Sequence, residues 1–147
     1  MKKPQVLAAC PSFASPTLER LLTRHVDLAY VNALDAATSL LERRSDFAMI
    51  ICAVYFDESR MFDLLHFARA NFPELPFLCV RVFDSDVSRV AGHAIAVATR
   101  TLGAVDYVDL VDLARAHGAE IADQRLQEVV LAHLRPPNGS VDELRRG

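Results

Sequence analysis

The sequence contains little of several residue types on which common functional sites depend. Cysteine occurs three times in 147 residues, a small and odd number that excludes a disulfide framework and fits a reducing compartment. Glycine occurs five times, and the turn after the first apolar segment, Pro11 to Ser15, contains none. A phosphate-cradling glycine loop at that place is therefore excluded.

Long apolar runs and basic clusters are also missing. The longest wholly apolar run, Phe47 to Phe56, has ten residues, whereas a membrane-spanning helix needs about 20. The 16 basic and 19 acidic residues give a formal net charge of −3, and no stretch is rich enough in lysine and arginine to follow a phosphate backbone. We therefore expect a soluble protein with neither a nucleic-acid partner nor a membrane partner.

The five histidines are scattered along the chain and do not indicate a metal site. None of them stands three or four residues from a second histidine or from a cysteine, which is the spacing that helical zinc ligands use. His66 follows Asp63 by three residues, and on a helix this spacing favours a surface pair. We predict no bound metal and no cofactor.

The remaining composition is that of one globular domain. Hydrophobic residues make up 52% of the chain and charged residues 24%, a balance that supports a sizeable core at this length. Linker-like composition occurs near the end, from Pro136 to Ser140. We therefore predict one domain over residues 4–135 and a C-terminal tail over residues 136–147.

Within the domain, apolar runs typical of buried strands alternate with segments of helical periodicity. The predicted strands are residues 5–10, 26–31, 47–54, 77–82 and 105–108. The predicted helices are residues 15–22 (capped by Ser15 or Thr17), 32–44 (capped by Asn32 or Asp35), 61–72, 84–102 and 119–134. No element is assigned to the extra segment Leu110 to Gly118.

This alternation indicates the fold class. Each connection between parallel strands is a right-handed crossover that passes over one face of the sheet. Five strands alternating with five helices therefore predict a three-layer α/β/α sandwich around a five-stranded parallel sheet of flavodoxin-like type. Ligands of such sheets bind at the carboxyl ends of the strands, near the point where the strand order reverses. The residues directly after each strand are therefore the candidates for function.

Two local segments resemble a known family. The segment Gly103 to Val108 (GAVDYV) is similar to the Gly-Ala-x-Asp-Tyr segment that enters the fifth strand of bacterial response-regulator receiver domains. Phe62-Asp63-Leu64-Leu65 resembles the start of a receiver's third helix, and the order of elements from Pro4 to Arg135 matches as well. The resemblance implies the strand order 2-1-3-4-5, a role in two-component signal transduction and a location in the bacterial cytoplasm.

The sequence departs from the receiver pattern where the family does its chemistry. Receivers transfer a phosphoryl group to an aspartate at the end of the third strand, and acidic residues after the first strand hold Mg²⁺. This chain has Cys10 and Pro11 in place of the acidic pair, Ala53 (or Cys52, if the strand is shifted by one) in place of the acceptor, Arg81 in place of a hydroxyl residue, and Leu110 in place of a lysine. Asp57 and Glu58 follow in the loop, but their spacing does not supply the acceptor and the metal ligands together. We therefore predict a pseudo-receiver that is not phosphorylated by the usual route and is not an enzyme.

Other features indicate a surface that binds protein. Tyr107 stands at the position of the receiver's aromatic switch residue, although packing alone also explains an aromatic side chain in a strand. The fourth predicted helix, residues 84–102, is nearly uncharged from Val90 to Ala98. It is more apolar than one buried stripe requires, so part of its apolar surface is expected at an interface. The candidate interface residues are Val90, His93, Ala94, Val97, Arg100 and Tyr107. The expected partner is another protein or a second copy of the chain in a homodimer, and deeper burial by Leu110 to Gly118 is the alternative explanation.

A second functional hypothesis, from a different class, uses the cysteines. Cys10 and Cys52 stand at the ends of strands that are neighbours in the receiver order, so their thiols would approach each other, and Arg81 would favour a thiolate. The chain would then be a small-molecule or thiol-redox binding domain that acts at the carboxyl edge of the sheet. Inert buried cysteines are the alternative, and Cys79 is expected in the core.

Overall fold

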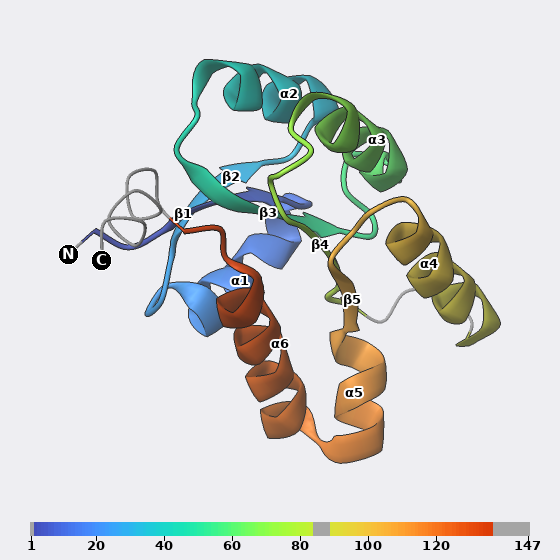
Figure 1. Cartoon of the computed structure of the whole chain (residues 1–147). Helices are drawn as coiled ribbons and strands as arrows, with labels where there is room; N and C mark the ends of the chain where they lie inside the picture. The colour runs from blue at the N-terminus through green and yellow to red at the C-terminus, as the bar shows by residue number, and fades with distance from the viewer. Residues whose placement is uncertain (1, 84–88, 137–147) are drawn as a thin grey trace, which may run out of the picture.

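Five parallel strands form the centre of the structure, in the order β2-β1-β3-β4-β5 (Figure 1). The computed structural model describes residues 2–83 and 89–136. The strands are β1 (Gln5–Ala9), β2 (Asp27–Val31), β3 (Phe47–Ala53), β4 (Phe77–Arg81) and β5 (Asp106–Asp109). The predicted fold class and strand order are confirmed, and each predicted strand is present to within a residue or two at its ends.

The burial of the strands follows their place in the sheet. All seven residues of β3 and all five of β4 are buried, because these strands have neighbours on both sides and helices over both faces. Every residue of the edge strand β2 is at least partly exposed. The continuous apolar sequence of β3 is therefore the signature of a central strand.

Helices cover both faces of the sheet and complete the three layers (Figure 1). Their bounds are α1 (Ser15–Leu22), α2 (Leu34–Arg43), α3 (Met61–Asn71), α4 (Arg89–Thr101), α5 (Leu110–His117) and α6 (Ala119–His133), and a single 3₁₀ turn covers Ser12–Ala14. Side chains of α1, α5 and α6 pack on one face around Met49 and Ile51. Side chains of α2, α3 and α4 pack on the other face around Ile50 and Cys52.

The helix α5 was not predicted. Sequence analysis counts five helices, whereas the described residues contain six α-helices, because the segment after β5 is helical from Leu110 to His117. The Asp109 carboxylate caps this helix by accepting a hydrogen bond from the Asp112 amide at 2.9 Å. Gly118, with φ of +94°, ends it. A helix of eight residues leaves only these short signals in the sequence.

The predicted caps of α1 and α2 are wrong. Ser15 is the first residue of α1, and its hydroxyl donates to the Ser12 carbonyl at 2.9 Å instead of capping. Neither Asn32 nor Asp35 caps α2, which begins at Leu34. The Leu34 amide donates instead to Oδ2 of Asp57 at 2.7 Å. A carboxylate from the loop after β3 therefore caps α2, which no local sequence pattern could indicate.

Two predicted features lie partly outside the described residues. The predicted start of the fourth helix at 84–86 is outside them, and α4 is described from Arg89 to Thr101. Residues 137–147 of the predicted tail are also outside them. Among the helices of the described ranges, none has the length and apolar character to span a membrane.

Candidate functional site at the carboxyl edge of the sheet

A cleft of about 880 Å³ opens where β1, β3 and β4 end. We call it the edge cleft. Three of the predicted site residues line it, namely Pro11, Ala53 and Arg81. Most of its remaining lining is apolar or aromatic and comes from Phe13, Ala14, Val54, Tyr55, Val82 and Phe83, with Ser12, Asn32, Asp57 and Glu58 as the polar members. Ala53, the predicted counterpart of a receiver's acceptor aspartate, is buried at the end of β3.

Exposed aromatic rings form the rim of the edge cleft. Phe13 comes from the 3₁₀ turn after β1, Tyr55 follows β3 and Phe83 follows β4. The rings of Phe13 and Phe83 lie 4.9 Å apart between centroids, tilted by 58°. These residues were not predicted as a group, although each stands a few residues after a strand. The feature that could have identified them is their shared position after the ends of adjacent strands.

The loop after β3 has an unusual backbone. Asp57, Glu58 and Ser59 have φ values of +44°, +54° and +74°, a left-handed run without glycine. Hydrogen bonds from the Phe56 amide to the Ala53 carbonyl and from the Arg60 amide to the Phe56 carbonyl enclose the run. Through Oδ2, the Asp57 carboxylate accepts the hydrogen bond from the Leu34 amide and holds the loop against the start of α2. No group of three or more potential metal ligands occurs in the described part of the chain.

The structure does not bring Cys10 and Cys52 together. Both are free and buried, but Cys10 packs on the face of α1 and α6, whereas Cys52 packs on the face of α2 and α3. Cys52 lies opposite Cys79 in the register of β3 and β4. Burial raises the pKa of Cys10 to about 11 and that of Cys79 to about 12, and it raises the pKa of Cys52 well above its ordinary value. Nothing in this arrangement favours a thiolate, so the geometry does not favour a thiol-redox site.

These pKa shifts predict how stability depends on pH. An unfolded thiol ionises near pH 9.0, whereas the buried Cys10 thiol keeps its proton up to pH about 11. Below pH 9 the thiols are protonated in both states and their full contribution to stability is present. Between pH 9 and pH 11 the free energy of unfolding falls, because the unfolded chain loses these protons and the folded chain keeps them. We therefore expect urea-unfolding midpoints to fall over that interval, and Cys79→Ala to reduce the fall.

The same burial predicts slow thiol chemistry in the folded protein. At neutral pH, Ellman's reagent should label the three cysteines at the rate of unfolding and at once in denaturant. Rapid labelling of one cysteine in the native protein would contradict the burial that we describe.

Arg81 is fixed by an ion pair at the end of β4. One guanidinium nitrogen, Nη1, lies 3.1 Å from Oδ2 and 3.4 Å from Oδ1 of Asp109, its neighbour in the register of β5. The Arg81 side chain is 5% exposed and that of Asp109 16%. Leu110, predicted to stand where receivers carry a lysine, packs in the core on the face of α6 and lines neither cleft. The charge of Arg81 at this edge is therefore paired and largely buried.

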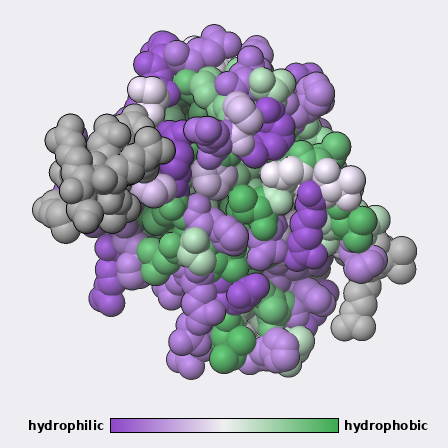
Figure 2. Space-filling model, in the orientation of Figure 1, coloured by the Kyte–Doolittle hydropathy of each residue, from purple (hydrophilic) through white to green (hydrophobic). Residues whose placement is uncertain are grey.

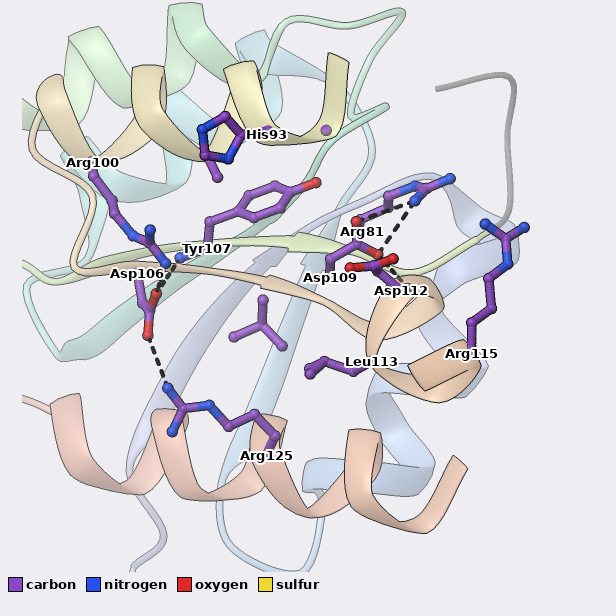
Figure 3. A pocket seen from close by; sticks show the side chains of 13 residues that line it. Arg81, His93, Arg100, Asp106, Tyr107, Asp109, Asp112, Leu113, Arg115 and Arg125 are labelled. Atoms are coloured by element: carbon purple, nitrogen blue, oxygen red, sulfur yellow. Dashed lines mark hydrogen bonds and ion pairs between the residues drawn. The ribbon is translucent and has the colours of Figure 1, made fainter. Parts of the chain in front are cut away.

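A second cleft, of about 800 Å³, lies between α4, β5 and α5 (Figure 3). We call it the α4–β5–α5 cleft. Asp106 lies in it and accepts hydrogen bonds from Nη2 of Arg100 and from the Tyr107 amide, each at 2.8 Å, and Arg125 of α6 lies 3.6 Å away. Burial alone would raise the pKa of the Asp106 carboxyl, but these donors and charges hold it below its ordinary value. Asp106 therefore stays ionised and ties α4 to β5 and α6.

Tyr107 lies beneath α4 in this cleft. Its side chain is largely buried, and Figure 3 shows the hydroxyl end of the ring pointing toward Arg81. The hydroxyl oxygen is buried without a hydrogen-bond partner among the described residues. Burial, followed by the nearby charge of Asp109, raises the pKa of Tyr107 above its ordinary value, so the ring stays neutral. The geometry fits a packing role for the Tyr107 ring.

The predicted interface residues of α4 face solvent. His93, Ala94, Val97 and Arg100 are all exposed, and His93, Arg100 and Tyr107 line the α4–β5–α5 cleft. The side chain of Val90 lies outside the described residues. On the face seen in Figure 2, apolar side chains occur in small groups among polar ones.

The sequence matches no protein-family model and no curated protein. Solved structures match it by fold. A signal receiver domain from Vibrio parahaemolyticus has a TM-score of 0.68 at 20% sequence identity, over 99% of this chain and 98% of that one. The N-terminal signal receiver domain of a two-component system response regulator from Bacteroides fragilis has a TM-score of 0.65 at 16% identity, over 88% and 95%. A response regulator from Thermotoga maritima has a TM-score of 0.62 at 15% identity, over 87% and 98%. The chain therefore shares the receiver fold.

Proposed function

We propose that the protein is a phosphorylation-independent pseudo-receiver, which acts in bacterial signal transduction by binding another protein or a second copy of itself. The observation that carries this proposal is the edge cleft, in which an alanine methyl and apolar side chains occupy the acceptor region. Aspartyl phosphorylation needs a carboxylate acceptor and metal ligands beside it. The shared receiver fold supports signalling as the setting.

The α4–β5–α5 cleft and the exposed side of α4 form the proposed binding surface. This surface combines exposed apolar side chains, arginines and a tyrosine, a composition that is frequent in protein interfaces. It carries both signs of charge, with Asp106, Asp109 and Asp112 beside Arg100, Arg115 and Arg125. Mixed charges suit an isologous dimer, in which one patch must complement itself. Regulation would then come from the abundance or location of the partner.

The first test is phosphorylation. We expect the purified protein to keep its unmodified mass after incubation with acetyl phosphate and Mg²⁺, while an ordinary receiver domain treated in parallel gains a phosphoryl group. A stoichiometric, acid-labile phosphoryl adduct on this protein would overturn the proposal.

The second test uses a matched pair of surface variants. Val97 on α4 and Leu131 on α6 are apolar and similarly exposed, at 51% and 48%. We expect Val97→Asp to weaken self-association or partner binding about tenfold or more, because a charge is desolvated at the interface, and we expect Leu131→Asp to leave it unchanged. Native mass spectrometry of each variant purified from its own cells measures both self-association and partner binding. Equal effects of the two variants would place the surface elsewhere.

A further inference from the structure

We propose that the edge cleft binds a small aromatic molecule that carries a positive charge. This inference is independent of the proposed partner surface, since it concerns the opposite side of Arg81. It assigns a ligand class to the cleft that replaces the phosphorylation site.

The size and lining of the cleft fit a small molecule. Its volume of about 880 Å³ lies within the range of sites that enclose drug-sized ligands. Ala53, Val54 and Val82 contribute apolar surface at the ends of the two central strands. Few polar side chains interrupt this surface, and two of them, Asn32 and Ser12, are hydrogen-bonded to each other at 3.3 Å. A ligand that enters the cleft therefore gains mainly by burying apolar area.

The aromatic rim specifies the shape of the ligand. Phe13 is 64% exposed, and Tyr55 and Phe83 are also exposed, so three rings at the mouth of one cleft face water. Phe13 and Phe83 already contact each other in a tilted pair, which leaves ring surface for a third ring. Aromatic faces attract flat rings and cations, because the π face is electron-rich. The rim thus favours a flat aromatic molecule with a cationic group.

The charges of the cleft specify the sign of the ligand. Asp57 and Glu58 line it, and Glu58 is exposed at the rim. Arg81, the cation among the described lining residues, is held against Asp109. An anionic ligand would meet two carboxylates, whereas a cation would be attracted by them and by the rings.

The backbone of the loop places these carboxylates. Left-handed conformations at Asp57, Glu58 and Ser59 cost free energy for residues that have a Cβ atom. Such strain persists where the surrounding structure requires it, and it gathers at binding sites. Here the cap that Asp57 gives to α2 holds the loop, and the loop in turn keeps Glu58 beside the aromatic rim. The acidic end of the cleft is therefore built into the fold before a ligand arrives.

The experiment compares two probes of similar shape and opposite charge. Benzyltrimethylammonium and phenylmethanesulfonate are titrated separately into the ¹³C-methyl-labelled full chain, and methyl and amide shifts are followed by NMR. We expect saturable shifts from the cation at Ala53, Val54 and Val82, and an affinity for the anion at least tenfold weaker. Absence of saturable shifts with the cation, equal binding of the two probes, or shifts centred on the α4–β5–α5 cleft would each overturn the proposal.

Matched variants separate the ring and charge contributions. Phe13→Ala removes an exposed ring, and Leu131→Ala removes another exposed apolar side chain elsewhere, at 64% and 48% exposure. We expect the first to weaken binding of the cation about tenfold, since a ring contact and a cation–π contact together are worth about one decade, and the second to leave it unchanged.

The charge contribution is tested by a second pair of variants. Glu58→Gln should weaken binding of the cation about threefold, with Glu128→Gln as its control. All four positions are exposed, so unfolding midpoints should stay constant. If the cation instead binds all variants equally, the cleft is not the site that we propose. The same holds if only a protein segment, and no small cation, binds at these residues.

Discussion

Replacing Arg81 by methionine should lower the free energy of unfolding by about 3 kcal/mol, because it leaves the largely buried Asp109 carboxylate without its guanidinium partner. Urea unfolding of the two proteins at neutral pH measures the difference. Arg81→Lys should recover part of the loss, since it restores a charge in a different shape. A change within about 0.5 kcal/mol for Arg81→Met, the range typical of surface positions, would show that the pair carries little of the stability of this edge.

The double variant tests the origin of that loss. Asp109→Asn removes the charge, yet its side-chain oxygen can still accept the Asp112 amide that caps α5. We expect Arg81→Met with Asp109→Asn to be more stable than the sum of the single changes predicts, with a coupling of about 1–3 kcal/mol. Additive effects would mean that Arg81 acts through contacts other than this carboxylate.

Replacing Gly103 by alanine should cost about 2–3 kcal/mol. Gly103 has φ of +105°, and a Cβ atom there would lie 2.7 Å from Cδ of Arg69. The Arg69 side chain cannot move easily, because its guanidinium donates to the carbonyls of Phe72, Pro73 and Leu75 at the end of α3. The substitution therefore either distorts the turn before β5 or breaks these hydrogen bonds. Thermal or urea unfolding of the variant measures the cost.

Two companion variants separate strain from collision. Gly118 also has a positive φ, of +94°, but no atom lies within 4 Å of the position of its Cβ. Gly118→Ala should therefore cost only the strain of this extended positive-φ backbone (ψ 159°), about 1–3 kcal/mol. Arg69→Ala removes the side chain with which the new methyl group collides, so Gly103→Ala should cost less in that background. Equal costs at the two glycines would show that contact with Arg69 is unimportant.

The sheet could be predicted because each strand is a short apolar run that is visible in the local sequence. The unbroken apolar run of β3 can only be accommodated between two covered faces, and the helical segments between the strands force parallel crossovers. The helix α5 escaped prediction because its eight residues hold too few periods to stand out, and the signals that remain are a capping aspartate and a terminal glycine.

The candidate site was less predictable, because it depends on register and on distant contacts. Ala9 lies opposite Cys52, so Cys10, one residue further along, presents its side chain to the other face of the sheet. The predicted approach of Cys10 to Cys52 is wrong because their side chains point to opposite faces. Strand boundaries predicted from the sequence are not exact enough to say which face a side chain is on. Asp57 caps a helix 23 residues earlier in the chain, and Phe13 meets Phe83 across the sheet edge. Contacts of this kind leave no periodic pattern.

Arg81 lines both the edge cleft and the α4–β5–α5 cleft, so one side chain belongs to the walls of two sites. A molecule that binds either cleft and prefers one arrangement of the Arg81–Asp109 pair changes the affinity of the other cleft by a definite factor. Thermodynamic linkage makes that factor the same in both directions. If both clefts bind as we propose, the Arg81–Asp109 pair would join them by a reversible equilibrium, whose set point is the concentration of the molecule that occupies either cleft.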